Sequence, residues 1–475
     1  MMIWQSAEEI KNFRPVMAWM RGQGGEMVQQ LLDNMPPAVR QALSGTLDTM
    51  ERGVQGMTAM IGQTVVQALL DSTPDSSPGH CGVCDSPLRL VDGQRARLQV
   101  GIFGPYALRR AYYVCPHGHG SDVPLDRRLG LGPYQASPAL SQIITRLAVE
   151  MPFDQVADTL RTVTGHIVDG EWVRRIAETI GDQAEGQEAA ACKAAASEQS
   201  PTRQPGPSAL VIATDGAMVY TTRNEERGWH EAKIGICARG EPVTSASTSV
   251  PEESRWEART TDYCVGFEPR TAFWTRLYAH ATQAGLEDPS CRLVALIGDG
   301  AHWIWEDGSV HLRPPNKMWV EILDFYHAME PVAIVAGAVW PHDPDAARAW
   351  RDNAAHHLKP EGAEGLTIAW SQLPPVPAAV QEVVDHERQY FAYHQDRINY
   401  PAFHRLGLPI GSGMVESACK TLLKQRESGS GMRWLERAAQ GIATLRALHR
   451  SGRWAAFWAT QPYATAVAKS RRVAA

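Results

Sequence analysis

Three acidic residues stand in local sequences that suit a metal-dependent active site. Asp215 and Asp299 each follow an apolar run, VIAT and LVALIG, that is typical of a buried strand, whereas Glu416 opens a stretch with apolar residues at helical spacing. Carboxylates are the hard oxygen ligands that Mg²⁺ prefers, and two such ions can stabilise both the attacking and the leaving oxygen of a phosphodiester displacement. The residues therefore predict a site for two Mg²⁺ ions, which Mn²⁺ could replace, and chemistry that cuts and joins nucleic acid.

The elements that must position these carboxylates indicate a multidomain α/β protein. A helical stretch is expected at 267–285. Strand-like runs occur at 209–221, 232–238, 242–249, 291–298 and 318–325. This order predicts an RNase H-like mixed sheet, in which the first and fourth strands lie side by side and present Asp215 and Asp299 to a shared cleft. Glu416 would arrive from a later helix, after a helical insertion.

The whole chain divides into segments by composition and breaks. The predicted segments are, in order, a helical N-terminal region (1–77), a zinc-ribbon-like domain (78–130), a helix-turn-helix DNA-binding domain (135–182), a linker (183–208), the first part of the RNase H-like core (209–340), the helical insertion (341–405), the C-terminal helices of the core (406–460) and a basic tail (461–475).

Composition limits what such a site can belong to. With 475 residues, of which 44% are hydrophobic, the chain can bury a large core and is not a small binding module. Its net charge of -6 gives no global attraction to polyanions, so contact with nucleic acid would need local basic patches and metal ions. No apolar run approaches a membrane span, no signal peptide is recognisable, and the eight cysteines lack a disulfide pattern. We expect a soluble, cytoplasmic, nucleoid-associated protein with reduced thiols and no membrane partner.

A zinc site is predicted between residues 81 and 119. Cys81-Gly-Val-Cys84 and Cys115-Pro-His117-Gly-His119 flank a stretch that alternates like a β-hairpin, which is the layout of a zinc ribbon. Tetrahedral Zn²⁺ takes four nitrogen or sulfur ligands, here a Cys₃His set. His119 is the preferred fourth ligand, since a single intervening residue would cramp His117. The alternative is a hairpin whose cysteines are simply buried.

Residues 137–182 show three short helical patterns, broken at Met151-Pro152, Thr164-Gly165 and Gly181. This spacing of short helices and breaks is typical of a helix-turn-helix, with a recognition helix that carries Arg174 and Arg175 into a major groove. Packing of three helices without DNA contact is the alternative.

Basic residues gather after Glu416. Lys420, Lys424 and Glu427 recur at helical spacing from Glu416 and would share a face with it, which predicts contacts with the DNA backbone. An ordinary solvated helical face is the alternative. The predicted DNA-binding set on these elements is Lys420, Lys424, Arg426 and Arg433.

Seven sequence motifs of the chain resemble those of a known family. TDGAMV, GWHEAKIG, GDGAHWIW, ILDFYHAMEPV, RINYPAF, PIGSGMVESACKTLLKQR and GMRWLERAAQGIATLR occur, in this order, in the DDE transposases of bacterial insertion sequences, within the ISKra family. The resemblance covers residues 80–455 and implies a DNA transposase with a catalytic triad of Asp215, Asp299 and Glu416. It departs in the zinc site, where the family usually has a second Cys after Cys-Pro-His.

The resemblance also implies a mechanism and partners. Asp215 would bridge both ions, with Asp299 and Glu416 each completing one coordination sphere. Water would cleave a strand at the element's end, and the freed 3′-hydroxyl would attack target DNA. The partners are double-stranded DNA, as terminal inverted repeats and target, and further copies of the chain in a dimer or larger assembly. The alternatives are a catalytically silent DNA-binding regulator and a nuclease that cuts without joining.

Two residues near the triad are further candidates. An Asp-x-x-His such as Asp324-Phe-Tyr-His327 also occurs in related transposases, so His327 could contact the scissile phosphate or orient the attacking water. A hydrogen bond in a strand-to-helix corner is its alternative role. Trp303 could stack on an unpaired base, with core packing as the alternative.

Overall fold

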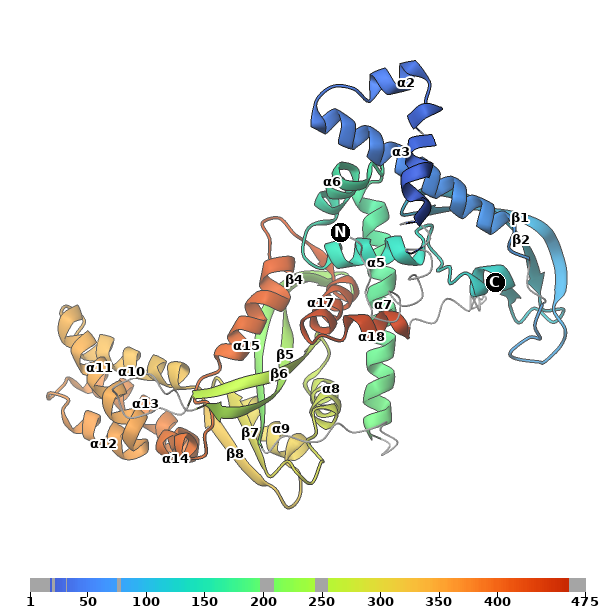
Figure 1. Cartoon of the computed structure of the whole chain (residues 1–475). Helices are drawn as coiled ribbons and strands as arrows, with labels where there is room; N and C mark the ends of the chain where they lie inside the picture. The colour runs from blue at the N-terminus through green and yellow to red at the C-terminus, as the bar shows by residue number, and fades with distance from the viewer. Residues whose placement is uncertain are drawn as a thin grey trace. The chain divides into compact units, whose positions relative to one another are not determined.

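The structure, a computed structural model, is mixed α/β and describes residue 18 and residues 22–30, 32–74, 78–196, 209–243 and 255–460 (Figure 1). The predicted basic tail, residues 461–475, lies outside these ranges. The chain forms two compact units. The first comprises Met1–Ala148, Pro152–Ala177 and Ala455–Ala475, and the second comprises Val149–Met151 and Glu178–Trp454. None of the helices in the described ranges combines the length and apolar character that crossing a bilayer requires.

The first unit is built on a β-hairpin. Its elements before the three-helix segment are α2 (Pro37–Ala42), α3 (Leu47–Asp71), β1 (Arg89–Gly101), β2 (Gly104–Val114), β3 (Ser121–Asp122) and α4 (Pro124–Arg128). β1 and β2 pair antiparallel and β3 adds to β2. α3 is fixed to β2 because the Gln67 side chain exchanges two hydrogen bonds with the Ala107 backbone, of 2.9 and 3.0 Å.

Three helices follow, α5 (Pro138–Ala148), α6 (Phe153–Thr164) and α7 (Gly170–Ala196). α6 begins after Pro152 and ends at Gly165, whose φ of 76° suits the left-handed C-cap conformation that glycine adopts freely. The prediction that a helix ends at Gly181 is wrong, since α7 continues to Ala196. A Cβ atom at Gly181 would lie 2.9 Å from the Gly441 Cα atom, so this glycine permits a close helix contact. The predicted linker 183–208 thus begins as helix, and its residues 197–208 lie outside the described ranges.

The second unit contains a mixed six-stranded sheet. Its strands are β4 (Ala209–Arg223), β5 (Glu226–Val243), β6 (Arg255–Gly266), β7 (Leu293–Gly298), β8 (Met318–Leu323) and the short β9 (Trp434–Leu435). The order is β6-β5-β4-β7-β8, with β9 beside the end of β4. β4 pairs antiparallel with β5 and parallel with β7, and β7 pairs parallel with β8. The first and fourth strands are therefore neighbours.

The third strand differs from its prediction. Residues 242–243 belong to the end of β5, residues 244–249 lie outside the described ranges, and the strand that pairs with β5 is β6. β6 lies at the end of the strand order, and no other strand of the described residues pairs with its outer edge. Its sequence RWEARTTDYCVG is rich in charged residues, which are common on edge strands and hide the usual apolar pattern.

Helices complete the second unit. α8 (Arg270–Gln283) and α17 (Glu436–Arg450) pack on the strands, and β7 is buried along its whole length. The predicted insertion follows α10 (Phe325–Val339) as a group of helices (Figure 1), which are α11 (Pro344–Glu361), α12 (Ala363–Ser371), α13 (Ala378–Tyr393), η1 (Gln395–Ile398) and α14 (Tyr400–Arg405). The remaining elements are α9 (His302–Leu312), α15 (Gly413–Ala418), the π-helix η2 (Cys419–Lys424), α16 (Gln425–Glu427) and α18 (Trp454–Ala459).

A buried histidine joins α7, β6 and α8. His280 is 2% exposed, its Nδ1 atom lies 2.5 Å from Asp262 Oδ2, and its Nε2 atom bonds to Glu188. Burial alone would lower the pKa of His280, but the charges of Glu188 and Asp262 raise it to about 9. Burial alone would raise the pKa of both carboxyl groups, but the charge of His280 holds each at about 2. The three side chains therefore form a buried ion triad.

We expect His280→Gln to destabilise the protein by about 3 kcal/mol at pH 6, because two buried carboxylates lose the imidazolium between them. Arg453 remains beside both, at 3.0 Å from Asp262 Oδ1 and 3.9 Å from Glu188 Oε2. The folded pKa of His280, about 9, lies above the ordinary 6.5, so its contribution is complete below pH 6.5 and is lost as the pH rises through 9. Urea midpoints at pH 6 and pH 9.5 measure this, with the exposed His342→Gln as control. An equal deficit at both pH values would contradict the prediction.

Candidate metal centres

Asp215 and Asp299 occupy equivalent positions on neighbouring parallel strands. In the register of β4 and β7, Ala213 lies opposite Ile297, and each aspartate follows two residues later. Neighbouring strands lie about 4.8 Å apart. Asp299 follows the end of β7, whereas Asp215 lies within β4, which continues to Arg223. Both aspartates are half-buried. The register therefore places these two predicted carboxylates at matching levels on neighbouring strands.

The helix that carries Glu416 is seated on Asp215. Cys419, one turn further along, donates a hydrogen bond from Sγ to Asp215 Oδ2 over 3.2 Å. Burial raises the pKa of Cys419 well above its usual range, and the charges of Asp215 and Glu416 add to the effect, so Cys419 is a neutral thiol. The buried Arg446 donates to the carbonyl oxygen of Leu422 over 2.9 Å, which supports the π-helical turn after Glu416. Glu416 itself is exposed.

A third aspartate extends the row. Leu323 of β8 lies opposite Gly298, so Asp324 follows β8 at the same level as Asp299 follows β7. Asp324 is fully buried, and its carboxylate accepts hydrogen bonds from the backbone N–H groups of His327, over 2.9 Å, and Ser412. The first of these bonds caps α10. Asp324 is thus bound to the helix after β8 and to the segment just before Glu416.

His327 and Asp324 form an ion pair. His327 Nδ1 lies 3.3 Å from Asp324 Oδ1. The hydrogen bond to Asp324 raises the pKa of His327 to about 9, and the charges of Glu330 and Asp299 contribute. Burial would raise the pKa of Asp324, but the bonds from His327 and Ser412 lower it to about 2. At neutral pH the imidazole is a cation near Asp299. It lies in the strand-to-helix corner that the sequence allowed as its alternative.

The predicted triad is not the group of ligand atoms that lie closest together. Among the described residues, Asp324, His327 and Glu416 bring one ligand atom each within 4.8 Å of one another, whereas Asp215, Asp299 and Glu416 do not form such a group. A histidine binds metal only as the neutral imidazole, so a metal held by this group would displace the proton of His327. Two catalytic ions lie about 3.5–4 Å apart and need not share all their ligands. The remaining donors, all carboxylate oxygens beside a protonated thiol, fit Mg²⁺ or Mn²⁺.

The basic residues after Glu416 divide into two groups. Lys420, Lys424 and Arg433 are exposed, as a DNA-binding role requires. Arg426 is 2% exposed, with its guanidinium 4.9 Å from the Trp434 ring centroid, so the prediction that it contacts DNA is corrected. Glu427 is also buried and does not share an exposed face with Glu416. The π-helix explains both differences, because its wider turn shifts the phase of every residue that follows.

Three other predicted DNA contacts have partners in the protein. The half-buried Trp303 ring packs against Trp274 and Phe273, with centroids 5.4 and 6.2 Å apart, which fits the core-packing alternative. Its role as a base-stacking platform stays a prediction. Arg174 and Arg175 both pair with Glu171 at 2.7 and 2.9 Å on the surface of α7. Exposed pairs of this kind contribute little stability, so these arginines can exchange Glu171 for a phosphate.

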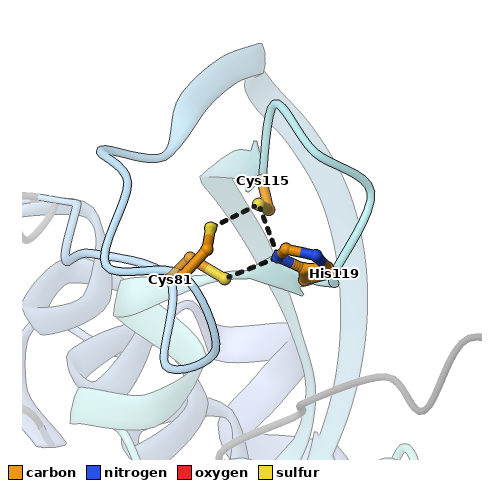
Figure 2. A group of neighbouring side chains, drawn as sticks. Cys81, Cys115 and His119 are labelled. Carbon is orange, nitrogen blue, oxygen red and sulfur yellow. Dashed lines mark hydrogen bonds between the residues drawn. The ribbon is translucent and has the colours of Figure 1, made fainter.

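The cysteine cluster has the geometry of a zinc site. Figure 2 shows Cys81, Cys115 and His119 pointing toward one another. His119 Nδ1 lies 3.8 Å from Cys81 Sγ and 3.7 Å from Cys115 Sγ, and the Sγ atoms of Cys84 and Cys115 are 3.6 Å apart. Ligands at the vertices of a Zn–S tetrahedron are about 3.8 Å apart, given a bond of about 2.3 Å. These four residues could therefore hold a metal such as zinc.

The electrostatics around the cluster favour thiolates at Cys84 and Cys81, whereas burial raises the pKa of Cys115. Hydrogen bonds from Ser86 lower the pKa of Cys84 to about 6, and the backbone N–H groups of Val83 and Cys84 lower the pKa of Cys81. Thiolates are the form that binds metal. His117 is not part of the group, and its ring centroid is 6.1 Å from that of His119. Gly118, with φ of 74°, makes the turn that brings His119 inward.

We call Asp215, Asp299, Asp324 and Glu416 the carboxylate centre. Two residues beside it were not predicted from the sequence. Cys419 follows Glu416 at one helical turn, and that spacing was a usable signal. Tyr390 reaches the loop after Asp299 from the insertion, and nothing in its local sequence indicates this. Burial and the charges of Asp299, Glu330 and Glu387 raise its pKa to about 12.

Compared with known proteins, the chain matches no protein-family model and no curated protein sequence.

Proposed function

We propose that the chain is a DNA transposase of the DDE class, with an RNase H-like core and a likeness to the ISKra family of bacterial insertion sequences. The observation that carries the proposal is the pairing of Asp215 and Asp299 at equivalent positions on β4 and β7, with the Glu416 helix bonded to Asp215. The strand order supports it as well, because the first strand lies between the second and the fourth.

The residues of the centre would have different roles in phosphoryl transfer. Asp215, Asp299 and Glu416 would hold two Mg²⁺ ions, which supply Lewis-acid stabilisation of the attacking and leaving oxygens. Cys419 fixes the rotamer of Asp215 through its hydrogen bond. His327, a cation held by Asp324, offers its charge to a phosphate oxygen. The reaction is cleavage of a strand at an element end by water, then attack of the 3′-hydroxyl on target DNA.

DNA binding in this proposal relies on local charge. The chain carries a net charge of -6, so its basic residues must be concentrated where the duplex lies. Lys420, Lys424 and Arg433 are exposed on the elements that follow Glu416. Arg174 and Arg175 occupy the first turns of α7, the candidate recognition helix.

The assay that tests the function uses the purified protein, its own flanking DNA ends and Mg²⁺. Cleavage at the ends followed by joining to a target duplex supports the transposase. Cleavage without joined products would identify a nuclease, and binding without cleavage would identify a regulator.

A helix surface supports the expected assembly of two or more copies. Seven large apolar side chains of α3 are exposed, and all but Met60 lie on one side of the helix: Leu47, Met50, Val54, Ile61, Val65 and Leu69. At 100° per residue they fall within about 60° of one line, which we call the outer stripe, on the side of α3 opposite the face that Gln63 and Gln67 bind to β2. We infer that a second copy of α3 covers the outer stripe, because Leu47, Val54 and Ile61 recur every seven residues as in a coiled-coil seam.

The size of the outer stripe fits such an interface. With exposed fractions of 42–69%, its side chains present on the order of 600 Å², and specific interfaces bury about 800 Å² per partner. A patch of this size is at the upper end of what a monomer exposes, which supports an interface at this helix.

Ile61→Asp is expected to convert the assembled protein to monomers, because it places a charge at the middle of the outer stripe. Sedimentation velocity of the full chain measures the change. Met60→Asp is the matched control, since Met60 is equally apolar and 69% exposed but lies outside the stripe. A wild-type monomer at tens of micromolar, or equal behaviour of the two variants, would contradict assembly through α3.

A further inference from the structure

The helical insertion brings one tyrosine against the loop that follows β7. Gly300 has a φ of 101°, and a Cβ atom at this residue would lie 2.4 Å from the Oη atom of Tyr390. The phenol oxygen therefore occupies the place that a side chain of residue 300 would fill. Because residue 300 directly follows Asp299, the hydroxyl group lies beside the backbone of a predicted metal ligand.

The segment that carries this tyrosine is fixed to the same loop by further contacts. The rings of Tyr393 and His302 have centroids 5.4 Å apart. The guanidinium of Arg397 lies 4.8 Å from the Trp305 ring centroid and pairs with Glu321 of β8 at 2.7 Å. α13 and η1 are thus attached to β8 and α9, on both sides of the Asp299 loop, so the position of the phenol is determined by packing.

The hydroxyl of Tyr390 is placed to donate. The side chain is half-buried, and no described residue accepts a hydrogen bond from its Oη atom. Its charged neighbours, Asp299, Glu330 and Glu387, are all acidic. A phenol among carboxylates stays protonated at neutral pH, and it offers its proton to an oxygen that arrives with the substrate.

We propose that Tyr390 is a catalytic residue, which donates a hydrogen bond to a non-bridging oxygen of the scissile phosphate bound at Asp299. This role rests on the proposed function. It assigns the insertion a part in the chemistry: α13 supplies a neutral donor beside the loop that follows Asp299, and His327 supplies a cation. Such donors act most strongly where negative charge develops during displacement.

Tyr390→Phe tests the role, because it removes one oxygen and keeps the ring packing. Single-turnover cleavage of an element end should fall about 10- to 100-fold, with DNA affinity unchanged. Tyr393→Phe is the matched control, since it removes the same atom from the same helix and should cleave at the wild-type rate. The second readout uses ends with an Rp or Sp phosphorothioate at the scissile phosphate. The ratio of the two cleavage rates should change in Tyr390→Phe and not in Tyr393→Phe.

The outcomes separate this role from the function on which it rests. If Tyr390→Phe cleaves like the wild type with an unchanged ratio of the two phosphorothioates, Tyr390 is not catalytic and the transposase proposal stands. If the wild type cleaves no ends while it binds DNA, the proposed function fails, and the role of Tyr390 fails with it. A slower Tyr390→Phe with an unchanged ratio would also overturn the contact with the phosphate.

Discussion

Asp215→Asn and Asp299→Asn are each expected to reduce strand cleavage by about 10³-fold or more. Each variant removes a charged oxygen ligand from a centre whose chemistry depends on two ions, and residues that act together lose most of their effect when one is removed. Binding of the element ends should persist, because it depends on basic residues outside the centre. Cleavage in Mg²⁺ and an electrophoretic binding assay measure the two effects separately.

The unfolding midpoint of each variant shows whether lost cleavage reflects lost chemistry or unfolding. The two aspartates are like charges at adjacent positions, so an Asn at either should leave the unfolding midpoint unchanged or raise it. Asp352→Asn, at an exposed position on α11, should cleave like the wild type. A cleavage-deficient Asp215→Asn that has also lost its thermal transition would show unfolding instead of lost chemistry. Full activity in Asp299→Asn would remove this residue from the proposed centre.

Loss of zinc is the second large effect that we expect. Cys84→Ser and His119→Asn should each reduce bound zinc from one ion per chain to none and should unfold the hairpin region. Structural zinc contributes about 10–16 kcal/mol of binding free energy, which is available only when the site is folded. Metal analysis and limited proteolysis of the full chain measure the two consequences, and a chelator should reproduce them in the wild type.

His117→Asn is the matched control for the zinc site. It changes the same residue type two positions away, and its ring lies outside the cluster, so zinc content should remain at one ion per chain. Zinc retained in His119→Asn but lost in His117→Asn would exchange the roles of the two histidines. A wild-type protein that contains no zinc as purified would favour the alternative of a hairpin with buried thiols.

Part of the carboxylate centre could be predicted because it depends on short-range patterns. The runs before Asp215 and Asp299 are apolar enough to require buried strands, and both strands are present as β4 and β7. The spacing of the cysteines predicted which residues come together at the candidate zinc site. In both cases a single local rule, burial or ligand spacing, was sufficient.

Other features depend on contacts between distant segments. Arg426 has the sequence context of an exposed helical arginine, but the π-helix rotates it toward Trp434. Tyr390 meets Gly300 only because the whole insertion folds back on the sheet. β6 was missed because its residues alternate weakly, whereas its pairing with β5 is determined by the backbone. No window of neighbouring residues contains this information.

The contact between Gly181 and Gly441 has a consequence for how the sequence can change over evolutionary time. Each glycine lowers the propensity of its own helix by about 1 kcal/mol relative to alanine, so selection on α7 or α17 alone would replace it. A Cβ atom at either position would come within 3.1 Å of the other backbone, so the first such replacement is opposed by the other helix. Substitutions at the two positions are therefore expected to occur together, so descendants of this protein should keep both glycines or lose both.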